Sequence, residues 1–137
     1  MSKNILKFLS FVVLVNCGTI VFGQDLTSFE GRWLNVSSTT LAMQFWFSDS
    51  GSISATALVF SGNKCYIEAM NGPMGVSRTR TWEGTFKVNP SKQTLDLIDE
   101  FGDSEIYRYV FSETEDEYVL KLKYTDGEIT SWYKSKN

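Results

Sequence analysis

The side chains that could carry out chemistry in this chain are mainly carboxylates, because its 137 residues include no histidine. Histidine is the commonest general base near neutral pH and the commonest metal ligand in proteins. Its absence excludes Ser-His and Cys-His nucleophilic sites. The sequence also contains neither a glycine-rich phosphate loop nor a Cys-x-x-Cys pair. Any catalysis would therefore depend on acidic groups.

Acidic residues gather in one short stretch that contains Asp96, Asp99, Glu100, Asp103 and Glu105. A calcium loop of the EF-hand kind needs oxygen ligands at alternate positions and a glycine at the sharp turn, and these residues do not follow that order. A solvated strand end followed by a turn is the better interpretation. We therefore predict a protein that is not an enzyme and that binds neither a cofactor nor a metal.

Residues 1–23 have the pattern of a secretory signal peptide. A charged start with Lys3 and Lys7 precedes a short apolar core, and small or aliphatic residues lead up to Gly23. Cleavage after Gly23 would leave a single mature domain of residues 24–137. This leader predicts a secreted or periplasmic protein.

The two cysteines, Cys17 and Cys65, bear on the compartment and on disulfide pairing. Residues 14–17 resemble a bacterial lipidation box, so the alternative to cleavage after Gly23 is a lipoprotein anchored to a membrane through Cys17. Once the leader is removed, Cys65 has no partner in its own chain for a disulfide. We expect its thiol to be buried and inert, the alternative being a bond to another chain.

The mature domain is acidic. The whole chain carries 13 Lys+Arg and 16 Asp+Glu, which gives a net charge of −3. Removal of Lys3 and Lys7 with the leader changes this net charge to −5. Nucleic acids and anionic membrane surfaces attract basic proteins, so neither is an expected partner.

Strand patterns dominate the mature domain, because β-branched and aromatic residues alternate with polar ones between turns marked by Gly, Asn and Asp. One helical turn is expected over residues 25–30, and no later window shows a helical period. The alternation predicts strands at 31–39, 42–49, 52–60, 65–70, 79–88, 94–99, 104–112, 117–125 and 128–135. Short hairpins favour an all-β, antiparallel up-and-down β-barrel of about eight to nine strands, since closure removes exposed edges.

The period of two also predicts which side chains face the barrel interior. The expected inward rows are Met43, Phe45 and Phe47; Ile53, Ala55, Ala57 and Val59; Trp82, Gly84, Phe86 and Val88; Tyr107, Tyr109 and Phe111; and Tyr118, Leu120, Leu122 and Tyr124. In the second row, the small Ala55 and Ala57 either accommodate large neighbours or leave a void.

This aromatic interior is the candidate site, because small-molecule pockets are mostly apolar with a few orienting polar groups such as tyrosine hydroxyls. The loop 70–77 carries soft apolar side chains, and Arg78 and Arg80 follow it, which would suit an amphipathic ligand with an anionic head. The candidate ligand-binding residues are Phe45, Phe47, Ala55, Ala57, Met74, Arg78, Trp82, Tyr107, Tyr109 and Tyr118. The alternative is that these side chains simply fill the barrel.

Residues 29–33, Phe-Glu-Gly-Arg-Trp, resemble the Gly-x-Trp signature that opens the first strand of lipocalins and of small bacterial lipocalin-like domains, which are calycin-type β-barrels. The resemblance implies that Trp33 closes one end of the barrel and that a ligand would lie at the other end, beneath residues 70–77. Lipocalins stack a late arginine on this tryptophan. Lys134 stands near the end of this chain instead, and would make a weaker cation–π contact.

We therefore expect an exported, non-catalytic lipocalin-like protein that binds a small apolar or amphipathic ligand in its barrel. The alternative is a protein-binding module, such as a periplasmic or secreted inhibitor or accessory subunit. Residues 82–102 also resemble the small β-barrel inhibitors of secreted proteases. Trp46, Trp132 or the loop 70–77 would then form the contact surface.

Overall fold

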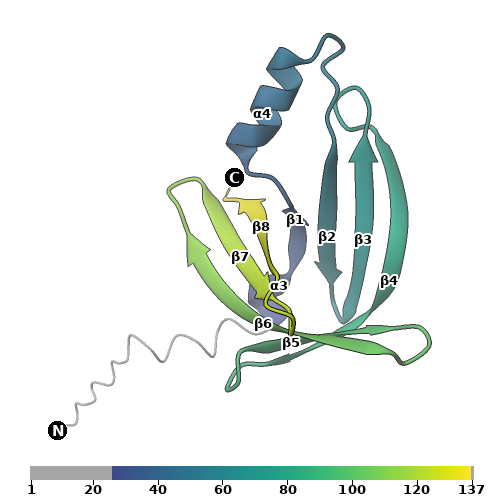
Figure 1. The fold of residues 1–137 in the computed structure, drawn as a ribbon, viewed down its shortest axis with the longest axis vertical. Helices are drawn as coiled ribbons and strands as arrows, with labels where there is room; N and C mark the ends of the chain where they lie inside the picture. The colour runs from purple at the N-terminus through teal and green to yellow at the C-terminus, as the bar shows by residue number, and fades with distance from the viewer. Residues whose placement is uncertain (1–25, 137) are drawn as a thin grey trace, which may run out of the picture.

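Eight antiparallel strands follow one another around a closed barrel in the order β1 to β8. The computed structural model describes residues 26–136, so the expected signal peptide 1–23 and Cys17 lie outside the described residues. The elements are α3 (Leu26–Phe29), β1 (Gly31–Leu34), α4 (Ser38–Phe47), β2 (Ala55–Ser61), β3 (Lys64–Asn71), β4 (Ser77–Asn89), β5 (Thr94–Asp99), β6 (Ser104–Glu113), β7 (Glu117–Lys123) and β8 (Ile129–Ser135). The prediction of an all-β, up-and-down barrel is confirmed (Figure 1).

The barrel closes through a short contact between its first and last strands. Every strand pairs with the next one along the chain, and β1 pairs with β8 at Leu34 and Tyr133. A register shift between Ile67 and Glu68 interrupts the pairing of β3 with β4. Such a bulge bends the strand and increases its twist, which helps a sheet to curl into a barrel.

The barrel has two distinct ends, because alternate connections of an up-and-down barrel lie at the same end. The plugged end is the one that carries α3 and the connections 62–63, 90–93 and 114–116. The open end is the one that carries the connections 35–54, 72–76, 100–103 and 124–128.

An aromatic plug fills the barrel at the plugged end. It consists of Phe29, Trp33, Phe60, Phe86, Tyr109 and Phe111. The Phe29 ring is fully buried and lies 4.9 Å from Phe111 and 5.2 Å from Phe60, between ring centroids, in edge-to-face arrangements. The Trp33 indole Nε1 donates a hydrogen bond to the Phe29 carbonyl at 2.8 Å. Residue 33 therefore closes this end of the barrel.

Strand β2 turns its alanines outward, so the predicted inward row in this strand was wrong. Leu58 and Phe60 belong to the main core together with Trp33. Ala57 belongs to a separate cluster, which includes Val59 and Met70. Both faces of β2 are apolar, and a shift of one residue exchanges them. Ala55 shares the outward row of Ala57, and neither alanine contributes space inside the barrel.

The small outward side chains of β2 make room for an ion pair that crosses this strand. Arg32 on β1 lies opposite Val59, and Glu68 on β3 lies opposite Ala57. Arg32 Nη1 and Glu68 Oε1 are nevertheless 2.6 Å apart, so their side chains meet over β2. Ala57 is fully buried and packs with Val59 and Met70. This gives the alanine a structural role on the outer face.

Residues 42–47 of the strand predicted at 42–49 belong to the helix α4, so the inward positions expected for Phe45 and Phe47 were also wrong. Ser37 caps the helix by accepting a hydrogen bond from the Thr40 backbone N–H at 3.2 Å. No residue of Ser38–Phe47 is buried. A helix that buries no face carries no apolar stripe, which is why the helical period was missing from the sequence.

Two contacts hold α4 beside the barrel. The Ser38 N–H donates to the Glu117 carboxylate at 3.0 Å, which places a negative charge at the positive end of the helix dipole. Near the other end of the helix, the Gln44 side-chain oxygen accepts from the Ser54 N–H at 2.8 Å. Figure 1 shows α4 projecting beyond the strands. Its side chains therefore do not occupy the barrel interior.

Candidate ligand-binding site

A cavity of about 240 Å³ lies inside the barrel at its open end. Its walls come from strands on opposite sides of the barrel, β2 and β3 on one side and β5 to β8 on the other, together with the turn 124–128. The lining residues are Leu58, Ile67, Leu97, Glu105, Tyr107, Leu122, Tyr124, Asp126, Glu128, Thr130 and Trp132. Because opposite walls contribute, this cavity belongs to the interior.

The deepest part of the cavity is apolar. Leu58, Leu97 and Leu122 are buried members of the main core, and Ile67 packs against them. Leucine side chains are smaller than the aromatic rings that fill the plugged end. The open end is therefore the part of the interior that side chains leave partly unfilled.

Tyr107 and Glu105 form the polar wall of the cavity. They are two residues apart on β6, so both point inward. The Tyr107 hydroxyl donates a hydrogen bond to Glu105 Oε1 at 3.0 Å. Burial, followed by this hydrogen bond, raises the pKa of Tyr107 to about 12. The hydroxyl consequently stays protonated near neutral pH and keeps donating to the carboxylate.

Two further aromatic residues, Tyr124 and Trp132, complete the wall. The ring of Tyr124 lies 5.3 Å from that of Tyr107, between centroids. The Trp132 indole Nε1 donates to Thr130 Oγ1 at 3.0 Å on the same strand. With its N–H already bonded, Trp132 offers the cavity mainly apolar ring surface.

The rim of the cavity is acidic. Glu105, Asp126 and Glu128 line it, and the described lining residues include no lysine or arginine. Asp126 Oδ1 accepts a hydrogen bond from the Glu128 N–H at 2.8 Å, which fixes the turn. An adjoining hollow of about 230 Å³ adds Asp99 and Asp103 to the same end.

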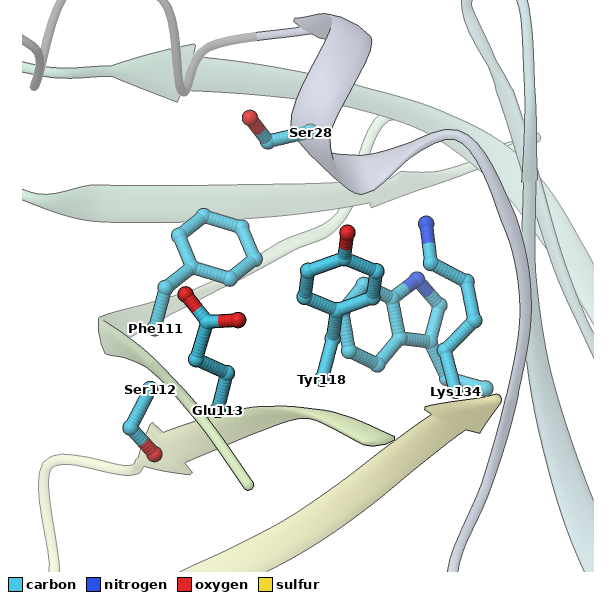
Figure 2. A pocket seen from close by; sticks show the side chains of 7 residues that line it. Ser28, Phe111, Ser112, Glu113, Tyr118 and Lys134 are labelled. Carbon is cyan, nitrogen blue, oxygen red and sulfur yellow. The ribbon is translucent and has the colours of Figure 1, made fainter. Parts of the chain in front are cut away.

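A larger pocket, of about 390 Å³, lies at the plugged end. Figure 2 shows Phe111, Glu113, Tyr118 and Lys134 extending from their strands toward the segment that holds Ser28. The Lys134 ammonium donates to the Glu30 carbonyl at 2.7 Å and lies 4.6 Å from the Trp33 ring centroid.

The charged groups of this plugged-end pocket are engaged by the chain itself. Partial burial lowers the pKa of Lys134, while its ammonium remains bonded to Glu30. Glu113 Oε2 and Lys136 Nζ are 2.5 Å apart. The expected contact of Lys134 with Trp33 is confirmed. These contacts close the barrel end, and we assign the pocket a structural role.

Two of the sequence-predicted site residues border the open end. Tyr107 lines the cavity, and Trp82 lines the adjoining hollow. The other eight lie elsewhere. Tyr109 is in the aromatic plug, Tyr118 lines the plugged-end pocket, and Ala55 and Ala57 face outward on β2. Arg78 lies in register with the outward Met70, Phe45 and Phe47 lie on α4, and Met74 lies in the connection 72–76 between β3 and β4. The predicted residues therefore do not form one site.

The rim residues were missed because sequence reasoning looked for aromatic side chains. Glu105 follows the same alternation as Tyr107 and Tyr109, and this row was the available signal. Asp126 and Glu128 lie in a turn, where an acidic residue ordinarily indicates only solvent exposure. Their place beside the cavity follows from barrel closure.

Cys65 and the remaining acidic groups form no metal centre in the described part of the chain. Within residues 26–136, no group of three or more His, Cys, Asp or Glu side chains is placed to hold a metal ion. Cys65 is fully buried, as expected, and burial raises its pKa to about 12. In the same range, none of the helices is long and apolar enough to cross a membrane.

Comparison with known proteins gives no match to a family model, to a curated protein or to a solved structure. The closed eight-stranded antiparallel barrel is consistent with a calycin-like fold. The function must accordingly be argued from the geometry of the barrel and its cavity.

Proposed function

We propose that this protein is an exported, lipocalin-like binding protein that holds a small amphipathic ligand in the open end of its barrel without catalysing a reaction. The observation that supports this most strongly is the 240 Å³ interior cavity, with an apolar floor and a polar wall at one side. Ligand pockets commonly combine a mostly apolar lining with a few polar groups that fix orientation. The leader at residues 1–23 supports export.

The residues around the cavity favour binding over catalysis. The chain contains no histidine to serve as a base. The Tyr107 hydroxyl is kept protonated and donates to Glu105, so it orients that carboxylate and does not act as a base itself. The lining is suited to holding a molecule.

Tryptophan emission offers a direct test, because Trp132 lines the cavity while Trp46 is exposed on α4. The mature protein would be titrated with a panel of short-chain amines, alcohols and carboxylates, together with retinoids and haem. We expect at least one class to change the emission, and Trp132→Phe to remove that change. Trp46→Phe is the matched control and should retain it. Absence of a response from every class, confirmed by calorimetry, would contradict the proposal.

A protein-binding role is the second candidate, and exposed apolar side chains favour it. Met43, Trp46 and Phe47 on α4 are 55%, 75% and 82% exposed, and Met74 in the connection 72–76 is 69% exposed. Met74 also adopts a φ of 55°, which is unusual for a residue with a side chain. Trp132, which was expected to contribute to such a surface, lines the cavity instead.

The ligand-binding and protein-binding functions predict different effects of substitutions in α4. A partner that docks on α4 should be lost from the variant Trp46→Ala/Phe47→Ala, while the response of Trp132 to cavity ligands should remain. Size-exclusion chromatography of the native protein and of this variant, each purified from the producing cells, would compare the bound partners. Identical elution and composition would exclude α4 as the docking surface.

A further inference from the structure

We infer that the ligand of the open-end cavity is a small organic cation, an amine or quaternary ammonium ion with a short apolar body. Its charge would lie among Glu105, Asp126 and Glu128, and its body on the leucine floor. This inference deepens the proposed function and rests on it. It concerns the chemical class of the ligand, which the barrel fold leaves open.

Uncompensated negative charge is the first argument. Within residues 26–136, the ion pairs join Arg32 to Glu68, Arg80 to Glu83 and Lys136 to Glu113, and none includes a carboxylate of the cavity rim. The lining itself brings no cation to these carboxylates. A wall of one charge sign concentrates ions of the opposite sign, so the rim attracts cations and repels anions.

Aromatic surface is the second argument. The rings of Tyr107 and Tyr124 lie 5.3 Å apart, and Trp132 lines the same cavity. The faces of tyrosine and tryptophan rings carry partial negative charge and attract ammonium groups. Carboxylates and aromatic rings therefore favour the same kind of ligand here.

The hydrogen-bond donors of the wall supply the third argument. A carboxylate or phosphate ligand would need free N–H or O–H donors to hold it. The Tyr107 hydroxyl is already bonded to Glu105, and the Trp132 N–H is bonded to Thr130. An anion held by either of these two donors would break its present bond, and the acidic rim would repel the anion's charge.

The arginines that were expected to hold an anionic head do not line this cavity. Arg80 stacks on the ring of Tyr66 on the outer face, with its guanidinium carbon 3.8 Å from the ring centroid. Its Nη1 is also 3.6 Å from Glu83 Oε1. Arg78 occupies the same side of β4, in register with the outward Met70. The expectation of a cationic rim is therefore replaced by an acidic one.

The cavity volume limits the apolar body of the ligand. At about 240 Å³, the cavity is just below the range of roughly 300–1,000 Å³ that is typical of ligand pockets. The floor of Leu58, Leu97 and Leu122 would contact a short alkyl or single-ring group. A long acyl chain would not fit within this volume.

Three probes with a chain of eight carbon atoms and different head groups test the charge preference: octyltrimethylammonium, 1-octanol and octanoate, each below its micelle-forming concentration. Isothermal titration calorimetry of the mature protein should show the cation binding about tenfold more tightly than the alcohol, or better, and octanoate binding most weakly. Added salt should weaken the binding of the cation and leave the affinity for the alcohol unchanged.

Glu105→Gln isolates the charge, because the amide oxygen can still accept the hydrogen bond from Tyr107. This variant should bind the cation several-fold more weakly and the alcohol equally well. Glu115→Gln, in the turn at the plugged end, is the matched control and should change neither affinity. If all three probes bound equally, or if Glu105→Gln bound the cation as tightly as the native protein does, the charge preference would be overturned while the binding function remained. No binding of any probe would overturn both.

Discussion

The two ends of this barrel are built from the same strands and serve different purposes. At the plugged end, α3 and the aromatic plug fill the interior, and Phe29 and Trp33 are almost completely buried. At the open end, leucines and an isoleucine form the floor beside Tyr107 and Trp132, and a cavity of about 240 Å³ remains between opposite walls. The side chains that the strands point inward therefore fill the centre of the barrel to a different extent at its two ends.

The two ends also differ in whether their polar and charged groups are bonded within the protein. At the plugged end, the Trp33 N–H bonds to the Phe29 carbonyl and the Lys134 ammonium bonds to the Glu30 carbonyl. At the open end, Asp126 and Glu128 line the cavity and take part in none of the ion pairs of residues 26–136. Satisfied groups stabilise a fold, whereas the remaining charges are available to a ligand. Under the proposed function, stability and ligand recognition therefore depend on opposite ends of the barrel.

Removal of the plug should have the largest effect on stability. Trp33→Ala deletes a side chain that is 1% exposed and packs against Phe111. We expect the free energy of unfolding to fall by about 3–5 kcal/mol, as measured by urea denaturation followed by circular dichroism. Phe47→Ala, which truncates an aromatic side chain that is 82% exposed on α4, should change it by about 0.5 kcal/mol or less. Similar losses in both variants would remove the distinction between plug and surface.

Loss of the lysine that covers the plug should have an intermediate effect. Lys134→Met keeps the aliphatic stem and removes both the hydrogen bond to Glu30 and the contact with Trp33. We expect a loss of about 1–2 kcal/mol in the free energy of unfolding. Lys64→Met, at the exposed start of β3 at the same end of the barrel, is the control. Ligand affinity at the open end should be equal in both variants, and a selective loss in Lys134→Met would show that the two ends are coupled.

Changes at the open end should alter stability less. Tyr107→Phe removes the hydroxyl that donates to Glu105 and should change the free energy of unfolding by about 1 kcal/mol or less.

The same variant has a spectroscopic signature, because the Tyr107 pKa is raised from 10.0 to about 12. The folded protein keeps a proton that the unfolded chain releases between these pH values. The Tyr107 contribution to stability is therefore fully present below pH 10 and is lost as the pH rises toward 12. An ultraviolet titration of the tyrosines should lack the ionisation near pH 12 in Tyr107→Phe and keep it in the control Tyr118→Phe.

Chemical labelling of the buried Cys65 thiol should measure how often the core around the aromatic plug opens, without a substitution in the plug itself. Cys65 packs within the main core, and burial raises its pKa from 9.0 to about 12. A thiol reacts as the thiolate, so iodoacetamide should not label the folded protein at about pH 8 and should label it rapidly in urea. Trp33→Ala should increase labelling under native conditions, because opening of the core becomes more frequent. Rapid labelling of the native protein would contradict the packing of this core.

Sequence alternation predicted much of the barrel because most strands have one clearly polar face. In β4, Phe86 is buried while Trp82 and Val88 pack against the core, as expected. In β2 both faces are apolar, since Ala57 and Val59 belong to a small buried cluster on the outer face, so alternation could not decide which row points inward. The residues of β2 that are buried on the outer face are as apolar as those that face the barrel interior.

The helix α4 and the acidic rim were missed for different physical reasons. Alternating Met43, Phe45 and Phe47 imitate a strand, and the helix buries no face that would impose a helical period. Asp126 and Glu128 are adjacent to the cavity only because barrel closure brings the turn 124–128 over the interior. Long-range placement of this kind has no local signature in sequence.

The central claim is that ligand recognition lies at the end of the barrel opposite the aromatic plug. Nuclear magnetic resonance mapping of octyltrimethylammonium on isotope-labelled residues 24–137 tests it most directly. The account predicts concentration-dependent shifts and intermolecular contacts at Leu97, Tyr107 and Trp132, with Phe29 and Trp33 unchanged. Shifts confined to the plugged end or to α4 would contradict it.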